Sequence, residues 1–176
     1  MGKWLSTLWY EFCRCHVFTG LTMGFSLRWE GGRNIPRRGP VLLVANHESF
    51  LDPIAVGLTT QRQIHFLARK TLFVGTFGKF LKSVNCVPVD QEGVAKEGLK
   101  TILDLLGEGH AVLVFPEGER TPNGEMLPLK GGIQLLIKRA PAPVVPIGIA
   151  GAHDAYPRDR ALPRFLPFFM PAWKRT

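Results

Sequence analysis

The sequence has few cysteines, and their spacing fits no disulfide framework. Cys13, Cys15 and Cys86 are odd in number, and Cys13 and Cys15 do not form a CxxC pair. A secreted domain stapled by disulfides needs an even set of cysteines at framework spacing. We therefore expect a chain of a reducing compartment, in which the cysteines serve as small apolar residues.

Acidic residues are also scarce, and the basic excess is scattered. The chain carries 14 Asp and Glu against 22 Lys and Arg, for a formal net charge of +8 and a pI near 9.8. Such a charge suits nucleic acid, an anionic membrane surface or a phosphorylated substrate. The basic residues form only short pairs, such as Arg37-Arg38 and Lys138-Arg139, without a long basic run or zinc-ligand spacing. We therefore expect no nucleic-acid partner.

The sequence offers no apolar run of the length that crosses a bilayer, about 20 residues. Residues 17–27 carry no charge, but this stretch is too short to span. A signal peptide is not expected either, because Glu11 and Arg14 interrupt the apolar stretch and no small-residue cleavage site follows it.

Residues 1–26 predict a helix with a polar and an apolar side. The polar residues Lys3, Thr7, Glu11 and Arg14 recur at helical spacing. The side opposite is mostly apolar and comprises Trp4, Leu5, Leu8, Trp9, Phe12 and Cys15. Two interpretations remain open: an ordinary helix packed on the domain, or an amphipathic helix lying in the membrane interface. We favour the interfacial helix, because so many aromatic residues exceed what a small core needs.

Residues 27–176 have the length and the 45% hydrophobic content of one domain with a real core. Apolar segments alternate with helical patterns, which predicts an α/β fold with a mostly parallel central sheet flanked by helices. The expected strands are residues 27–30, 41–45, 64–68, 86–89, 111–115 and one within 142–151. The expected helices are residues 53–59, 71–83 (broken near Gly75 and Gly78), 94–106 and 132–139.

Two loops that follow buried strands carry the polar residues suited to chemistry. One is Asn46–Asp52, after the strand 41–45, and the other is Pro116–Arg120, after the strand 111–115. Ligands of α/β sheets collect at the carboxyl ends of the strands. If the two strands are neighbours, both loops open on one site.

The first loop combines an imidazole with a carboxylate. Asp52 precedes Pro53, and one interpretation is that it is a helix N-cap with no further role. The other is that it accepts the Nδ1–H of His47 and leaves Nε2 free as a base. Because Ser49 is not an obvious nucleophile, such a base would act on a hydroxyl of the substrate. General-base assistance of this kind accelerates a reaction by roughly 10²–10⁴. The alternative is a histidine with a purely structural hydrogen bond.

The second loop offers a cation. Arg120 could grip a phosphate through paired, charge-assisted hydrogen bonds, or form a surface ion pair with Glu117 or Glu119. Arg69 and Lys70 follow the strand 64–68 and could supply further cations at the same end of the sheet. Their alternative is the basic start of a helix.

Four segments together resemble a known family. NHESFLD (46–52) matches NHxxxxD, FPEGER (115–120) matches an FPEGTR-like block, and ARK (68–70) and VVPIGI (144–149) match its second and fourth motifs. Their order and spacing over about residues 25–150 resemble the glycerolipid acyltransferase family, particularly the 1-acyl-glycerol-3-phosphate (lysophosphatidic acid) acyltransferases.

The resemblance implies a direct acyl transfer. His47 would be the general base on the acceptor hydroxyl and Asp52 would orient it. The hydroxyl would attack the thioester of acyl-CoA or acyl-carrier protein without an acyl-enzyme, giving phosphatidic acid. No metal ion or bound cofactor is expected. The substrate-binding residues would be Arg69, Lys70, Glu117, Gly118, Arg120 and Lys130, with Val145, Pro146 and Ile147 shaping the acyl or acceptor pocket.

The resemblance also implies where the protein works. We expect it at the cytoplasmic face of a membrane, as a peripheral or monotopic protein, with the helix 1–26 as its docking element. Alternatives are an acyltransferase that acts on glycerol-3-phosphate or another lysolipid, and a catalytically dead lipid-binding protein at the membrane surface.

Two departures from the family pattern stand out. Glu119 replaces the usual threonine, which would weaken phosphate binding if its carboxylate points inward and be harmless if it points to solvent or pairs with Arg120. Family members usually continue with further sheet beyond the strand at 144–149, so we expect the acyltransferase domain 27–176 to be truncated at its C-terminus. The Pro-punctuated apolar end, which comprises Phe165, Leu166, Phe168, Phe169 and Trp173, would pack on the core or touch lipid.

Overall fold

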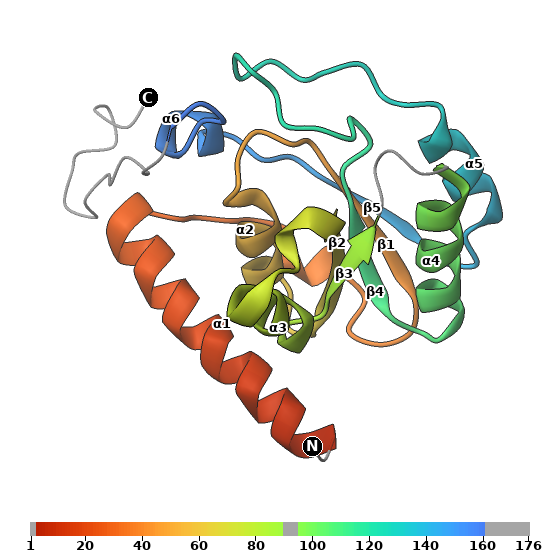
Figure 1. Cartoon of the computed structure of the whole chain (residues 1–176), viewed down its shortest axis with the longest axis horizontal. Coiled ribbons are helices and arrows are strands. Elements are labelled where there is room, and N and C mark those ends of the chain that lie inside the picture. The colour runs from red at the N-terminus through yellow and green to blue at the C-terminus, as the bar shows by residue number, and fades with distance from the viewer. Residues whose placement is uncertain (1–2, 90–94, 161–176) are drawn as a thin grey trace.

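The computed structural model describes residues 3–89 and 95–160, and Figure 1 shows their arrangement. Helices alternate with strands along the chain, as the sequence predicts. The elements are α1 (Lys3–Phe25), η1 (Gly32–Asn34), β1 (Val41–Ala45), α2 (Asp52–Thr59), β2 (Ile64–Arg69), η2 (Lys70–Leu72), α3 (Gly75–Ser83), β3 (Cys86–Val89), α4 (Ala95–Gly107), β4 (Ala111–Val114), α5 (Gly132–Arg139), β5 (Val144–Ile147) and α6 (Ala152–Ala155).

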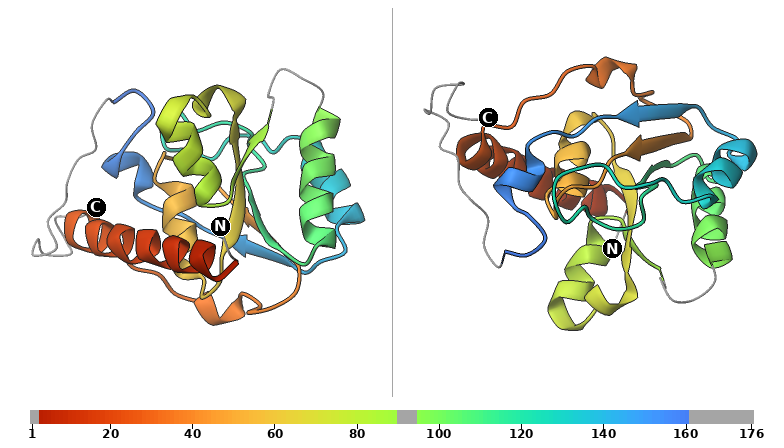
Figure 2. Two further views of the ribbon diagram at one scale, coloured as in Figure 1. Left: turned by 60° about the horizontal axis from the view of Figure 1, so that its bottom comes forward. Right: turned by 90° about the horizontal axis from the view of Figure 1, so that it is seen from above.

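The strands form one sheet in the order β3-β2-β4-β1-β5, and every pairing is parallel. Parallel sheets need helical crossovers, and these cover both faces. In Figure 2, α4 and α5 lie on one side of the sheet, while α1, α2 and α3 lie on the other. The predicted α/β architecture is therefore confirmed. In this order β4 is the central strand, and β1 lies between β4 and the edge strand β5.

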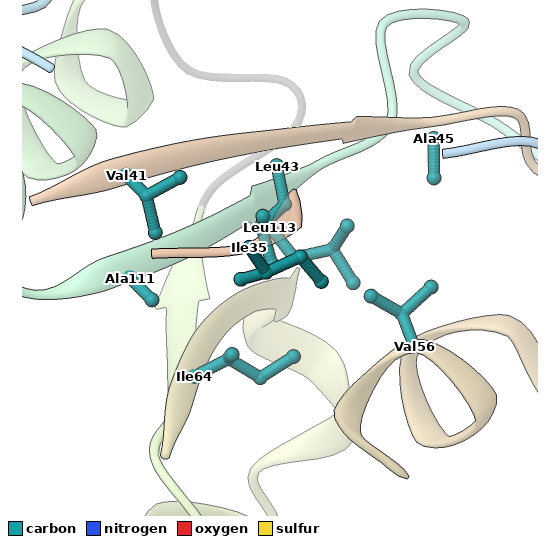
Figure 3. Packing of buried hydrophobic residues seen from close by; sticks show 8 residues of the cluster. All are labelled: Ile35, Val41, Leu43, Ala45, Val56, Ile64, Ala111 and Leu113. Carbon is teal, nitrogen blue, oxygen red and sulfur yellow. The ribbon is translucent and has the colours of Figure 1, made fainter. Parts of the chain in front are cut away.

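Each face of the sheet has its own apolar core, because successive strand residues point to opposite sides. Val41, Leu43 and Ala45 of β1 pack toward Val56 of α2 in the cluster that Figure 3 shows. Leu42 points the other way, into a cluster with residues of α4 and α5. Both clusters bury the strands that precede the two polar loops, so those loops start from rigid positions.

Two local predictions are wrong in detail. Residues 27–30 form no strand, since Arg28, Trp29 and Glu30 are all exposed and offer no face for a sheet to bury. The helical segment 71–83 does break at Gly75, where α3 begins with a positive φ of 57°. Gly78, however, lies inside α3 and is buried. A Cβ on it would lie 2.3 Å from the backbone carbon of Phe73, so this glycine permits close packing and does not break the helix.

Helix α1 packs on the domain at a few points. Tyr10 and Leu21 are buried, and the backbone N–H of Ile64 donates to the Tyr10 hydroxyl at 3.3 Å. Arg14 donates to the carbonyl of Thr60 at 3.3 Å. Many large apolar side chains of α1 stay exposed, namely Trp4, Leu5, Leu8, Trp9, Phe12, Phe18 and Met23. No described helix has the length and apolar content needed to cross a bilayer. The interfacial role of residues 1–26 stays a prediction, and the apolar end at 165–173 lies outside the described residues.

Candidate active site

The two polar loops meet. β1 and β4 are parallel neighbours, so the loops after them leave the same edge of the sheet. The backbone N–H of Thr121 donates to the carbonyl of His47 at 2.9 Å, and the N–H of His47 donates to Glu117 Oε1 at 2.7 Å. The two strands are therefore neighbours, as a single shared site requires.

His47 and Asp52 form a directed pair. The imidazole Nδ1 lies 2.8 Å from Asp52 Oδ2, and the Asp52 side chain is fully buried. The same oxygen accepts the backbone N–H groups of Glu48 at 2.6 Å and Ser49 at 2.7 Å. An ionised carboxylate can only accept, so the hydrogen resides on Nδ1 and Nε2 keeps its lone pair. Among the described residues, Nε2 has no hydrogen-bond partner, and the ring stacks on Phe115 with centroids 4.0 Å apart.

The structure excludes two alternatives for this loop. Asp52 is the first residue of α2, and its carboxylate faces back to the loop rather than capping the helix that follows. Ser49 is fully buried and donates its hydroxyl to the carbonyl of Tyr156 at 2.7 Å. Its oxygen also accepts the N–H of Leu51, so it is placed as a structural group rather than a nucleophile.

A second set of bonds ties the loop to β5 and α6. Asn46 exchanges two hydrogen bonds with the backbone of Ile149, at 2.7 and 2.8 Å, just beyond β5. The Glu48 carboxylate accepts from Asn46 Nδ2 at 3.0 Å and from the N–H of His153 at 3.2 Å. Burial raises the pKa of Glu48, partly opposed by the His153 bond. The loop that carries His47 is thus held on both sides.

Glu117 is buried and is not placed for a surface ion pair with Arg120. Only 1% of its surface is exposed, and its two carboxylate oxygens accept the N–H groups of His47 and Leu127 at 2.7 and 2.8 Å. A buried carboxylate of this kind fixes backbone segments to each other. Its place is behind the site, where it holds the two loops together.

Arg120 lies beside the His47 loop, and no carboxylate of residues 3–89 or 95–160 forms a salt bridge with it. Its guanidinium carbon stands 3.4 Å from the ring centroid of Phe50, a cation–π contact. Its Nη1 is buried and has no hydrogen-bond partner among the described residues. Burial, and next the nearby charges of Arg158 and Arg69, lower its pKa. Glu117 accepts backbone N–H groups and Glu119 pairs with Arg158, so neither forms the expected ion pair with Arg120.

The remaining predicted residues lie around this pair of loops. Arg69 ends β2, next to β4, close enough to act on Arg120, whereas Lys70 is exposed at the start of η2. Gly118 has a φ of +74°, which only glycine adopts freely, and a Cβ there would lie 2.9 Å from the Lys130 side chain. The structure thus brings Arg69 and Lys130 to the site's border, while any role for Lys70 stays a prediction.

Sequence reasoning missed three residues at the site. Phe115 and Phe50 stack on His47 and Arg120, and both lie within segments already recognised, so their aromatic character was the available signal. Arg158 follows α6 and pairs with Glu119 at 3.3 Å. No motif marks it, and only the return of the chain over the loop brings it here.

A cavity of about 290 Å³ lies beside the site and not within it. Its walls come from residues 27–35, the α2 residues Ala55, Val56 and Thr59, and residues 145–150 at the end of β5. Val145, Pro146 and Ile147 line it, whereas His47, Asp52 and Arg120 do not. The candidate site is therefore the edge of the sheet where the two loops meet, and this cavity lies outside it.

Comparisons with known proteins agree on one family. A family model described as Acyltransferase matches residues 26–150. A 1-acyl-sn-glycerol-3-phosphate acyltransferase of Bacillus subtilis is 33% identical over 144 residues, which cover 81% of this chain and 71% of that protein. The human 1-acyl-sn-glycerol-3-phosphate acyltransferase alpha is 31% identical over 140 residues, covering 76% of this chain and 48% of that protein.

A solved structure has the same fold. The crystal structure of the 1-acyl-sn-glycerophosphate (LPA) acyltransferase PlsC from Thermotoga maritima matches with a TM-score of 0.72 and 28% identity. The match covers 90% of this chain and 63% of that one. Against several relatives, including the human protein, this chain spans about half of their length.

Proposed function

Because the chain belongs to the acyltransferase family, we propose that it transfers a fatty acyl group from an acyl thioester to the free hydroxyl of 1-acyl-glycerol-3-phosphate, giving phosphatidic acid. The observation that carries this proposal is that His47 and Arg120 lie on neighbouring loops at the same edge of the sheet. His47 keeps Nε2 available, while the guanidinium of Arg120, which has no salt-bridge partner in the described part of the chain, stacks on Phe50 of the same loop. A base beside an anion site suits an alcohol that bears a phosphate.

The first chemical step moves one proton and forms one bond. Nε2 of His47 takes the proton of the acceptor hydroxyl as the alcohol oxygen attacks the thioester carbonyl. The imidazolium that forms is stabilised by the buried carboxylate of Asp52, 2.8 Å from Nδ1. Glu48 and Ser49 hold that carboxylate through their N–H groups, so the pair needs no reorganisation during the step.

The second step releases the thiol. The tetrahedral intermediate collapses, its C–S bond breaks, and the leaving thiolate takes the proton from His47 Nε2. The products are the ester and a free thiol, and the enzyme returns to its starting protonation state. No residue is acylated, which agrees with the buried and hydrogen-bonded state of Ser49.

The acceptor's phosphate would bind Arg120. Stacking on Phe50 supports the guanidinium, whose paired N–H groups suit a bidentate contact with a phosphate. Arg69 would add charge from the neighbouring strand end, and Lys130 from across Gly118. The reaction as proposed uses only these side chains and the two substrates, without a bound cofactor.

A thiol-release assay tests the reaction and identifies the substrates. The full chain is offered acyl-CoA or acyl-carrier protein with lysophosphatidic acid, glycerol-3-phosphate, lysophosphatidylcholine or monoacylglycerol as acceptor. We expect thiol release that depends on lysophosphatidic acid and forms phosphatidic acid. Release with glycerol-3-phosphate alone would move the acceptor assignment to that substrate. No release with any pair would refute the proposed activity.

We also propose that the protein works at the cytoplasmic face of a membrane. The exposed Trp9 and Phe12 of α1 line an open apolar groove together with Phe80 of α3, and Trp9 Nε1 donates to Ser83 Oγ at 2.9 Å. Trp4 of α1 is exposed as well. Aromatic side chains with nearby lysines favour the interface of an anionic bilayer. The three cysteines are odd in number and lack framework spacing, which favours a reducing compartment.

Liposome sedimentation tests the membrane proposal. Replacing Trp4 and Phe12 with serine should release the protein from vesicles that contain phosphatidylglycerol, because both side chains point to solvent and their loss leaves the core intact. Replacing the exposed Trp29, which lies on the segment after α1, serves as the matched control. Equal sedimentation of both variants and the parent chain would contradict docking through α1.

A further inference from the structure

Arg158 stands at the site although no motif includes it. It follows α6, and its Nη1 lies 3.3 Å from Glu119 Oε2. It is close enough to Arg120 that its charge contributes to the lowered pKa of that guanidinium, second only to burial. Arg69 contributes in the same way, so Arg120 has two further cations within electrostatic range, and we call the three the cation cluster.

The chain segment that carries Arg158 is fixed to that loop. The buried hydroxyl of Ser49 donates to the Tyr156 carbonyl at 2.7 Å, and the rings of Phe50 and Tyr156 lie 5.6 Å apart. Phe50 is also the ring beneath Arg120. Tyr156 thus fixes this segment to the His47 loop, and Arg158 follows Tyr156 by two residues.

Glu119 is the one carboxylate among the described residues paired with this cation cluster by a salt bridge. Its side chain is 44% exposed and that of Arg158 is 48% exposed, so water screens their attraction. Exposed ion pairs of this kind contribute little, and their partners separate readily. Like charges held close repel, and a dianionic phosphate would relieve that repulsion far better than one screened carboxylate.

We propose that Arg158 is a specificity-determining residue that binds the acceptor's phosphate together with Arg120, and that Glu119 holds Arg158 in place until the phosphate replaces it. This inference rests on the proposed function, since it takes the acceptor to be a phosphate monoester. It also gives Glu119 a role: its carboxylate faces Arg158 rather than Arg120, so it competes with the phosphate for one cation only.

Calorimetric titration of the full chain with 1-hexanoyl-glycerol 3-phosphate, a water-soluble acceptor, tests the proposal without turnover. Arg158→Gln should weaken binding about 5- to 20-fold, since one charge-assisted contact is lost. Arg38→Gln removes the same charge from the opposite end of the sheet and should leave binding unchanged. Affinity of the Arg158→Gln variant within about twofold of the parent would overturn the assignment.

Glu119→Gln separates competition from simple repulsion. If Glu119 acts through Arg158, this substitution should tighten binding about 2- to 5-fold in the parent and have no effect in the Arg158→Gln background. Equal tightening in both backgrounds would show that Glu119 repels the phosphate independently, which would overturn its role as a holder of Arg158.

Kinetics distinguish failure of this inference from failure of the proposed function. Arg158→Gln should raise the KM for lysophosphatidic acid and leave kcat and the KM for the thioester unchanged. If Arg158→Gln binds the acceptor more weakly but the parent chain shows no turnover, the phosphate site stands and the acyl transfer is refuted. Normal turnover with an unchanged KM in Arg158→Gln would keep the acyl transfer and overturn the role of Arg158.

Discussion

Asp52→Asn probes the pairing on which the proposed reaction depends. The substitution keeps the size of the side chain and removes one buried charge. Oδ2 of Asp52 accepts three hydrogen bonds, from Nδ1 of His47 and from the N–H groups of Glu48 and Ser49. A hydrogen bond to a charged acceptor contributes about 1 kcal/mol more than one to a neutral acceptor, so the free energy of unfolding should fall by about 2–3 kcal/mol.

The effect on the reaction should be larger. Without the carboxylate, the imidazolium of His47 loses its buried counter-charge, and an amide can present its NH₂ group and select the wrong tautomer. We expect kcat to fall about 10³-fold in the thiol-release assay, with the acceptor's KM changed by less than about threefold.

A control variant and an unfolding curve make the result decisive. Asp104→Asn removes a carboxylate that is 61% exposed on α4 and should change neither activity nor stability. Urea unfolding of both variants shows whether the assay sample is folded. A folded Asp52→Asn enzyme whose kcat lies within about threefold of the parent would refute the orienting role.

Three further predictions concern the anion site, the loop junction and stability. Arg120→Lys should raise the acceptor's KM about 10-fold without changing the KM for the thioester, because an ammonium cannot make the bidentate contact; steady-state kinetics check this. Glu117→Gln should lower the free energy of unfolding in urea by about 2 kcal/mol, since the amide has one oxygen for the two N–H groups of His47 and Leu127. Burial is the main cause that lowers the pKa of His65 from 6.5 to about 4, so the unfolded chain binds more protons there between those pH values. The free energy of unfolding should therefore fall by about 1–3 kcal/mol from pH 7 to pH 4. His65→Gln should flatten that part of the curve.

Much of the fold could be predicted because burial leaves a plain pattern. VLLVA at 41–45 is apolar on both faces, and the structure buries it under helices on both sides. The pattern failed at residues 27–30, where a short mixed segment offers no buried face. Gly78 was misjudged because its role is close packing against Phe73, which depends on a tertiary contact.

At the site, residues close in sequence were easier to place than residues brought together by the fold. His47 and Asp52 share one loop, so their hydrogen bond followed from spacing and chemistry. Glu117 was considered as a surface partner of Arg120, and only the register of β4 beside β1 turns it toward the His47 backbone. Arg158 could not be predicted, since its position depends on the anchor of Tyr156 on Ser49.

Measuring acyl transfer and acceptor binding in His47→Ala shows whether His47 takes the proton of the acceptor hydroxyl. We expect thiol release to fall by about 10²–10⁴ while lysophosphatidic acid binds within a few fold of the parent. Undiminished thiol release from the folded variant would contradict it.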